Sequence, residues 1–319
     1  MARVDPEQVR YFRLNNATRT AHVRGIDLPP ELEEASKFVR EAVRTYPELY
    51  FARFVVLGEG ASEEVVLPRL AEAMGLDIDR SFVAVVPLGG RHVNHLWRLL
   101  NSLEIPHATL LDLDWGRNGG GWGRIKTSCE ELLKIGVSPA DLFGQKNLGP
   151  LSPATNLAAV ANNPIDNVQL FDLWFACLRR FNLFFSAPLD LDYAMLKAYP
   201  MAYRTLEPGR QGPSSTGDPR TAVLGEHGLG HLYEAGSEPD LRWYRYLFLG
   251  RGKPSTHVRV LSGIAPDELA AGAPEPLRAL LTSIVQRLAP PAPVAPPLPV
   301  ALPPLPPVPP PLPPLPPQF

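Results

Sequence analysis

The chain has 319 residues, 45% of them hydrophobic and 20% charged, which is typical of a globular protein with one large domain or two ordinary ones. The net charge of −2 excludes a uniformly basic protein, although a local basic strip is enough to hold phosphates. Because no apolar run approaches the roughly 20 residues of a membrane span and the first residues lack a signal-peptide core, we expect a soluble, cytoplasmic protein without membrane contact.

The first 50 residues are predicted to be a polar remnant or linker segment that ends in a helix over residues 30–46. That helix opens with Pro30 and three acidic residues, which suit a helix N-terminus because proline fixes φ and negative charge stabilises the helix dipole. Apolar residues then recur at helical spacing, so one face of the helix is expected to be buried.

The next region alternates between short apolar runs and amphipathic stretches. Each run is rich in β-branched residues and ends at glycine, proline or aspartate, as buried strands do. This rhythm predicts a parallel sheet with right-handed crossovers. The expected order is strand 54–57, helix 63–74, strand 82–86, helix 93–103 and strand 108–113.

The sequence after residue 116 is glycine-rich and then helical. We expect a further strand at 183–185, a long loop over 207–240, which is rich in Gly, Pro, Ser and Asp, and a last helix at 276–288. The final stretch is Pro, Leu, Val and Ala without charge, so it is expected to be a disordered, polyproline II-like tail. The predicted division is a parallel α/β domain at 51–190, a mixed or helical C-terminal region at 191–288 and the tail at 289–319.

Four acidic residues follow the predicted strands. Glu59 comes directly after the first strand, Glu63 falls in the first turn of the next helix, and Asp112 and Asp114 end the third strand. Because open α/β sheets bind ligands at the carboxyl ends of their strands, these carboxylates are expected to converge. They would repel one another without a cation, and Mg²⁺ or Mn²⁺ is the natural choice for carboxylate oxygens.

Alternation of side chains along an extended segment predicts that Asp112 and Asp114 point to the same side, with Leu113 directed into the core. An Asp-x-Asp pair by itself also occurs in phosphatases, glycosyltransferases and many loops. A Glu at a helix start is often only a partner of the dipole. The combination after two βα units is more specific than either motif.

Three motifs resemble one family. They are Glu-Gly-x-x-Glu at 59–63, Leu-Asp-Leu-Asp-x-Gly-Arg-x-Gly-Gly-Gly at 111–121 and Leu-Phe-Leu-Gly-Arg-Gly-Lys-Pro-Ser-Thr-His at 247–257. Together they resemble the Toprim domain and C-terminal region of overcoming-lysogenization-defect (OLD) nucleases. The segment Pro-Leu-Asp-Leu-Asp at 188–192 is also similar to that group, and the resemblance covers roughly residues 10–288.

The resemblance implies a two-metal endonuclease that acts on DNA, with two Mg²⁺ or Mn²⁺ ions. Glu59 and Glu63 would hold one cation, and Asp112 and Asp114 would hold the other or bridge the two. Lys253 matches the catalytic lysine of the family. Two cations can activate a water and stabilise a leaving oxygen, and a lysine can neutralise charge on the phosphate.

Basic residues near these motifs are candidate DNA contacts. Aromatic residues interleave with cations between residues 242 and 259, a stretch without Asp or Glu, which is typical of a nucleic-acid strip but also of a solvated face. The glycine-rich loop after the Asp pair adds another arginine, in a segment that serves equally well as a hinge. The candidates are Arg117, Arg245, Arg251 and Arg259.

The chain departs from full OLD proteins in one respect. No G-x-x-x-x-G-K-[ST] loop occurs, so an ATPase or helicase activity would need a separate partner subunit. The alternative reading is therefore a non-catalytic DNA-binding or assembly subunit of an ATPase–nuclease phage-defence system, and a homodimer is also possible. Topoisomerase and primase activities need further domains for which the sequence gives no sign.

Overall fold

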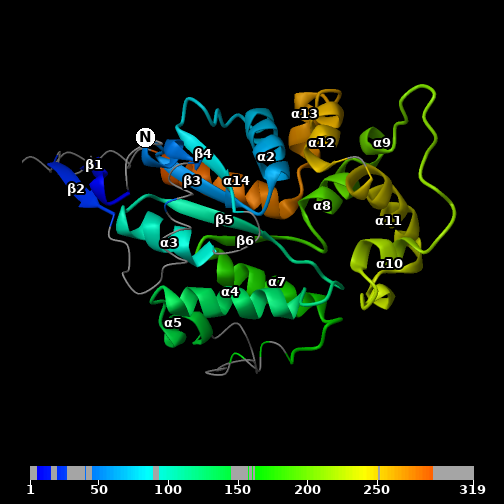
Figure 1. The fold of residues 1–319 in the computed structure, drawn as a ribbon, viewed down its shortest axis with the longest axis horizontal. Helices are drawn as coiled ribbons and strands as arrows, with labels where there is room; N and C mark the ends of the chain where they lie inside the picture. The colour runs from blue at the N-terminus through cyan, green and yellow to red at the C-terminus, as the bar shows by residue number, and fades with distance from the viewer. Residues whose placement is uncertain are drawn as a thin grey trace, which may run out of the picture. The chain divides into compact units, whose positions relative to one another are not determined.

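Four parallel strands form the centre of the chain in the order β4-β3-β5-β6 (Figure 1). The register is regular, with Val56 of β3 opposite Val85 of β4 and Ala108 of β5. This arrangement confirms the predicted parallel α/β sheet, and each predicted strand lies within two residues of an observed one. The strands are β3 (Phe54–Gly58), β4 (Val83–Pro87), β5 (His107–Asp112) and β6 (Leu183–Ser186).

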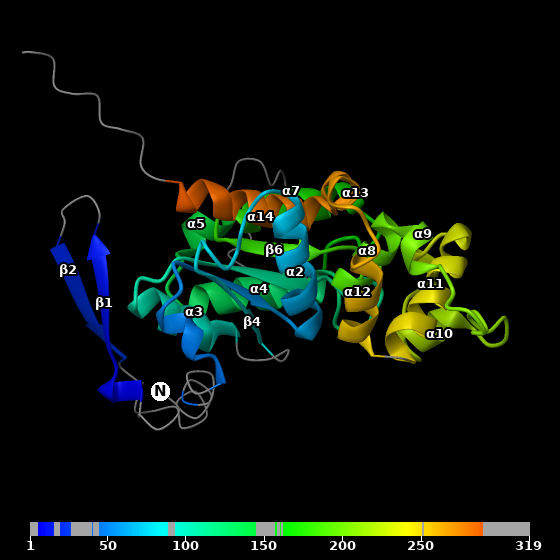
Figure 2. The same ribbon diagram turned by 90° about the horizontal axis from the view of Figure 1, so that it is seen from above.

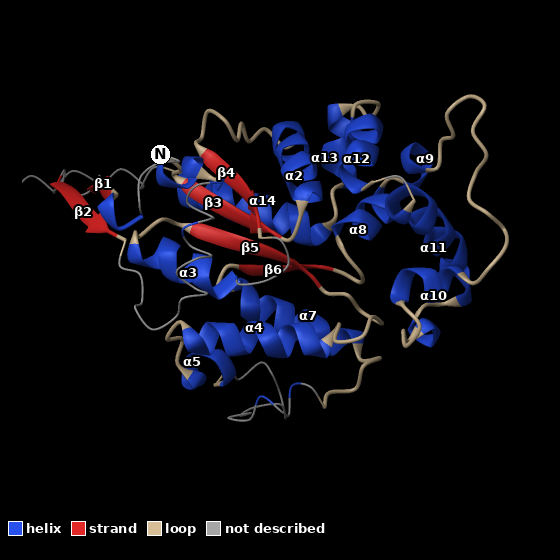
Figure 3. Cartoon of the chain, in the orientation of Figure 1, coloured by secondary structure: helices blue, strands red, loops and turns tan. Residues whose placement is uncertain are grey.

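Helices cover both faces of the sheet, as Figure 3 shows in side view. Alternate residues of a strand point to opposite faces, so Val55 packs in one apolar cluster and Val56 in the other. The first cluster joins the sheet to α3 (Val93–Ser102), α4 (Trp122–Lys134), α5 (Pro139–Phe143) and α7 (Val168–Arg179). The second joins it mainly to α2 (Ala61–Ala73) and α14 (Glu275–Leu288). Burial on both faces explains why the strand sequences are continuously apolar.

A group of shorter helices lies beyond the carboxyl ends of the strands (Figure 2). Helix α12 packs against α2, which brings the last predicted motif to this edge of the sheet. The predicted loop at 207–240 is partly wrong, because it contains α10 and two 3-10 turns. The group comprises α8 (Leu191–Ala198), α9 (Pro200–Tyr203), α10 (Pro219–Leu224), α11 (Glu238–Tyr244), a π-helical turn (Arg245–Leu249), α12 (Lys253–Leu261) and α13 (Pro266–Gly272).

The N-terminal segment contains a hairpin that the sequence pattern did not predict. Strand β1 (Arg10–Asn15) pairs antiparallel with β2 (Thr20–Gly25). Its large apolar side chains Phe12, Leu14 and Val23 are exposed. Residues 12–15 and 21–24 do alternate between apolar and polar, but each alternating run is only four residues long, and its apolar side chains lie on an exposed face rather than in the core.

The computed structural model describes residues 6–15, 20–26, 40, 45–88, 93–144, 157, 160, 162–250 and 252–289. Most of the helix predicted at 30–46 and the proline-rich tail lie outside these residues. Met1–Leu288 forms one compact unit and a second unit begins at Ala289, while the predicted boundary at residue 190 stays a prediction. Within the described ranges, no helix combines the length and the hydrophobicity needed to cross a membrane.

Candidate functional site

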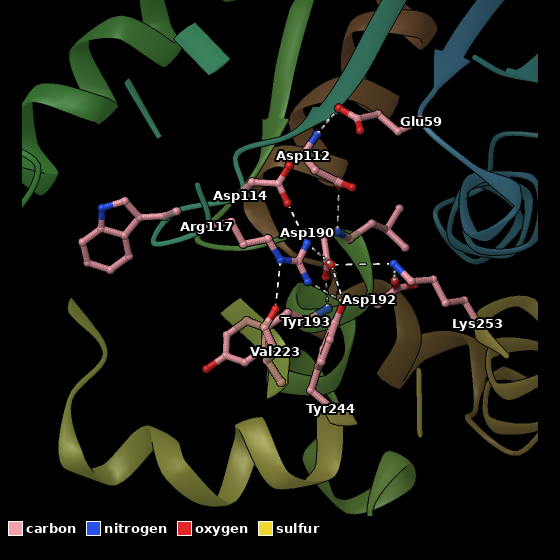
Figure 4. Close-up of polar contacts among 12 residues, drawn as sticks. Glu59, Asp112, Asp114, Arg117, Asp190, Asp192, Tyr193, Val223, Tyr244 and Lys253 are labelled. Atoms are coloured by element: carbon pink, nitrogen blue, oxygen red, sulfur yellow. Dashed lines mark hydrogen bonds and ion pairs between the residues drawn. The ribbon is translucent and has the colours of Figure 1, made fainter. Parts of the chain in front are cut away.

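Three of the four predicted carboxylates meet where β3 and β5 end. Glu59 follows β3 and Asp112 is the last residue of β5 (Figure 4). Glu63 lies in the first turn of α2. The backbone N–H of Asp112 donates to Glu59 Oε1 at 3.0 Å, and the N–H of Leu191 donates to Asp112 Oδ1 at 3.2 Å. These bonds tie the two strand ends and the start of α8 into one site.

Glycine is required between β3 and α2. A Cβ atom on Gly58 would lie 2.6 Å from Cβ and Cγ of Glu63, so only glycine lets the Glu63 side chain pack over the strand end. The Glu63 carboxylate then accepts a hydrogen bond from the N–H of Gly60 at 3.0 Å, which satisfies a donor at the start of α2. The Gly-Glu-Gly sequence therefore sets where both glutamates lie.

Asp114 does not continue the strand, so the prediction that it points with Asp112 from an extended segment is wrong. Strand β5 ends at Asp112, and Asp114 has a left-handed φ of 53°. Its carboxylate is held by two arginines instead. Arg117 Nη1 lies 2.6 Å from Oδ1, and Arg124 Nε donates to Oδ2 at 2.9 Å.

Two further aspartates belong to the site, and the candidate residues chosen from sequence did not include them. Asp190 and Asp192 lie where β6 passes into α8, with 1% and 2% of their surface exposed. Asp190 caps α8 by accepting from the N–H of Tyr193, and its other oxygen accepts from the Tyr244 hydroxyl. The signal was present in the Pro-Leu-Asp-Leu-Asp segment, which also follows an apolar strand.

Lys253 reaches these aspartates from α12, although 60 residues separate them in the chain. As the first residue of α12, it lies beside the start of α2, against which α12 packs. Its Nζ atom is 2.6 Å from Asp192 Oδ2 and 3.7 Å from Asp190 Oδ2. The structure thus brings Lys253 to the carboxylates, as the resemblance implied.

A buried chain of hydrogen bonds supports Asp192 from behind. His257 Nε2 lies 2.8 Å from Asp192 Oδ1, and His257 Nδ1 lies 2.5 Å from the Tyr203 hydroxyl. Ser62 of α2 also donates to Asp192 Oδ1, at 2.7 Å. Because Tyr203 and His257 are fully buried, the chain fixes the aspartate so that its other oxygen faces Lys253.

Burial makes several of these carboxyl groups hard to ionise. Desolvation, followed by the charges of Asp190 and Glu59, raises the pKa of Asp112 well above its usual range. Desolvation likewise raises the pKa of Glu63 to about 7, with a smaller contribution from Asp192. It also raises the pKa of Glu59, against the opposing charge of Arg124. A gathering of carboxyl groups with raised pKa values is typical of a site that receives a cation.

The pKa of Asp192 is shifted in the opposite direction from those of Glu59, Glu63 and Asp112. Burial acts to raise its pKa, but the hydrogen bond from His257 and the charge of Lys253 together lower it to about 2. The pKa of Lys253 is raised, because the attraction of Asp192 and Asp190 outweighs desolvation. The two groups therefore stand as a carboxylate and an ammonium ion.

These side chains surround a cavity of about 360 Å³, here named the carboxylate cavity. Its lining includes Glu59, Glu63, Asp112, Asp192 and Lys253. In chemistry and charge this set of oxygens fits Mg²⁺ or Mn²⁺. As the side chains stand, the described residues contain no ready group of three or more His, Cys, Asp or Glu ligands, since arginines and backbone N–H groups hold several of the oxygens.

The predicted DNA contacts have different surroundings. Arg117 is bound to Asp114 and Asp190 inside the site, and Arg259 pairs with Glu207 at 3.2 Å. Arg245 is exposed and borders a cavity of about 280 Å³, whereas Arg251 lies outside the described residues. The aromatic strip is also divided, because Tyr244 is buried against Asp190.

The parallel sheet, with acidic residues at the ends of β3 and β5, is a Toprim-type α/β fold, a class whose members generally bind divalent metals. Residues 50–114 match the family model described as overcoming lysogenization defect protein-like, TOPRIM domain. The match covers 65 of the 319 residues; over that segment it confirms the resemblance predicted from sequence, and it supports a nuclease-type family.

Solved structures similar to the chain include C-terminal regions of OLD proteins. That of Burkholderia pseudomallei is 18% identical, with a TM-score of 0.47 over 75% of this chain and 100% of that chain. That of Xanthomonas campestris pv. campestris is also 18% identical, with a TM-score of 0.43 over 76% of this chain and 96% of the other. A search of curated proteins found no match.

Proposed function

We propose that this chain is a divalent-metal-dependent DNA endonuclease of the OLD and Toprim type that hydrolyses phosphodiester bonds. The observation that carries the proposal is the carboxylate cavity, in which acidic side chains from three segments face Lys253. Buried carboxylates with raised pKa values favour a cation among them, and a phosphodiester is the anionic substrate that such a cation serves.

Glu59, Glu63 and Asp112 would hold the metal on the side of the carboxylate cavity, and Asp114 would hold a second ion or bridge the two. Divalent cations at such carboxylates supply an activated water and stabilise negative charge on the leaving oxygen. The backbone N–H groups of Gly60 and Leu191 orient the Glu63 and Asp112 side chains, so their oxygens are directed before a ligand arrives.

Lys253 would act on the substrate itself. Lys253 lies on the cavity wall and its side chain is 39% exposed, so its ammonium group can approach a phosphate while it stays paired with Asp192. A fixed positive charge next to the phosphate stabilises the transition state because charge accumulates on the phosphate oxygens there. Arg245, with its exposed side chain, is a suitable contact for the DNA backbone away from the scissile bond.

The test is cleavage of supercoiled plasmid by the purified chain with Mg²⁺ or Mn²⁺. We expect nicked and linear products that disappear with EDTA and in the variants Glu59→Gln and Asp112→Asn. Glu72→Gln is the matched control, because Glu72 is an exposed residue of α2 that pairs with Arg69 away from the site. An uncut plasmid under conditions where a Toprim nuclease control cuts it would refute the activity.

A second candidate is a non-catalytic DNA-binding or assembly subunit that works with a separate ATPase or helicase. The observation that favours it is that arginines already pair with the carboxylates of Glu59 and Asp114. In that case the chain binds DNA or an ATPase partner with the same affinity in Mg²⁺ and in EDTA. Addition of such a partner to the plasmid assay distinguishes a dependent nuclease from a silent subunit.

A further inference from the structure

The Arg124 guanidinium lies between two of the acidic residues at the strand ends. Arg124 is in the first turn of α4, directly after the glycine-rich loop. Its Nε donates to Asp114 Oδ2 at 2.9 Å, and its Nη2 donates to Glu59 Oε2 at 3.1 Å. One side chain therefore neutralises carboxylates that follow two different strands.

The glycine-rich loop makes this placement possible. A Cβ atom on Gly120 would lie 1.8 Å from the carbonyl oxygen of Asp114, so the loop folds tightly back on the aspartate only because glycine is present. This fold returns the start of α4 to the strand ends. The position of Arg124 is thus built into the backbone.

Arg124 and a metal ion would require the same oxygens. A divalent cation at Glu59 and Asp114 would compete with the guanidinium, because two positive charges repel each other at the same pair of carboxylates. The neighbouring Arg117 is less free to leave, since it also binds the Val223 carbonyl and the Tyr244 hydroxyl. The Arg124 guanidinium, by contrast, donates its hydrogen bonds to the carboxylates of Glu59 and Asp114.

A second cavity has Arg124 in its wall. This side cavity has a volume of about 440 Å³ and lies between α3 and α4, sharing Glu59 with the carboxylate cavity. Its wall is open to solvent, and Lys134 pairs there with Glu131 at 2.7 Å. The other polar groups of the wall come from Asn94, His95, Thr127 and Ser128. A guanidinium released from the carboxylates has room there, and its donor geometry suits a phosphate.

We propose that Arg124 is an exchangeable cation that couples metal binding to DNA binding. It holds Glu59 and Asp114 until a divalent metal takes their oxygens, and then it turns toward the side cavity and binds a phosphate of the DNA strand next to the scissile bond. This inference rests on the proposed function. It adds a phosphodiester subsite in the side cavity, with Arg124 as its ligand.

The first test measures Mn²⁺ affinity without DNA, by calorimetry or by electron paramagnetic resonance of free Mn²⁺. Loss of the competing guanidinium is expected to tighten Mn²⁺ binding about tenfold in Arg124→Gln, because the binding-competent state is then always populated. Arg124→Lys keeps the positive charge but not the planar guanidinium, so its Mn²⁺ affinity should lie between those of the parent and Arg124→Gln. Lys126 is a half-buried residue of α4 that pairs with Glu130, and Lys126→Gln controls for general charge removal and should bind Mn²⁺ like the parent.

The second test measures affinity for a fluorescent single-stranded oligodeoxynucleotide in Ca²⁺ and in EDTA. The parent protein is expected to bind DNA more tightly in Ca²⁺ than in EDTA. In Ca²⁺ the DNA affinity of Arg124→Gln should be about tenfold weaker than that of the parent, whereas in EDTA the two affinities should be equal. Equal Mn²⁺ affinities, or an equal gain with Ca²⁺, would overturn the exchange. Neither readout needs cleavage, so an inactive chain that shows both effects refutes only the nuclease activity.

Discussion

Lys253 illustrates how much one residue of this site depends on its partner. Its ammonium group lies 2.6 Å from Asp192 Oδ2, and the aspartate keeps it charged and directed at the carboxylate cavity. We expect Lys253→Ala to lower the turnover number for plasmid nicking by about 100-fold or more, because the transition state loses a fixed positive charge. Single-turnover cleavage at saturating Mg²⁺ measures this effect.

A measurement of Mn²⁺ affinity distinguishes a catalytic role of Lys253 from a general disturbance of the metal site. Since Lys253 is a cation rather than a ligand, its removal should leave Mn²⁺ binding intact or strengthen it. Lys126→Ala, at a half-buried position of α4 outside the carboxylate cavity, serves as the control for loss of a lysine. Unchanged turnover in Lys253→Ala would remove the residue from the mechanism.

The raised pKa of Glu63 predicts how the stability of the folded chain depends on pH. Its pKa in the folded chain is about 7, above the ordinary 4.5, so the folded state binds the proton more tightly than the unfolded state does. The stabilisation from this group is complete below the ordinary pKa and is lost as the pH rises through about 7. In EDTA, the melting temperature should therefore fall between about pH 5 and pH 8, and less steeply in Glu63→Gln. The same slope in both proteins would contradict the assignment.

At the scale of elements, three helices meet around Asp192. Ser62 from α2, Tyr203 from α9 and His257 from α12 form a hydrogen-bonded cluster that holds the aspartate at the start of α8. Their sequence separation means that no local pattern reveals the cluster. Only the packing of α12 against α2 brings the groups together.

Tyr203→Phe tests this support with a minimal change. The substitution removes one hydroxyl and keeps the ring that packs against Phe248, so we expect a loss of about 1 kcal/mol in the free energy of unfolding. If the chain of bonds positions Lys253, the turnover number should also fall several-fold while the KM for DNA stays constant. Tyr246→Phe, on the half-buried aromatic pair with Trp243, is a control for loss of a tyrosine hydroxyl. Equal turnover in both variants would make Tyr203 purely structural.

The elements also show where prediction from sequence succeeds and where it fails. Strand β3 was predicted because a buried parallel strand is apolar on both faces and ends at glycine. The hairpin of β1 and β2 was missed because each of its alternating runs, such as the one that begins at Phe12, is only four residues long. The conformation of Asp114 was also missed, since a left-handed residue after a strand depends on Arg117 and Arg124 rather than on alternation.

At the scale of the whole molecule, the buried carboxyl groups of the site repel one another when they are ionised, and a bound metal would relieve this repulsion. Mg²⁺ or Mn²⁺ that binds only the folded chain should raise its melting temperature in proportion to the logarithm of the ion concentration. Differential scanning calorimetry should show this rise in the parent protein and its loss in Asp112→Asn, with Glu72→Gln behaving like the parent. A melting temperature that is insensitive to either ion would refute the metal site.

The sequence by itself determined the sheet and the acidic residues at its edge, because strand burial and the turn after each strand are local properties of the chain. It also indicated the resemblance that residues 50–114 confirm. Only the tertiary structure decided which charges neutralise one another. Asp192 meets Lys253, and Arg124 bridges Glu59 and Asp114, through contacts between segments far apart in the chain. Electrostatic energy depends on distance in space, and sequence spacing does not give that distance.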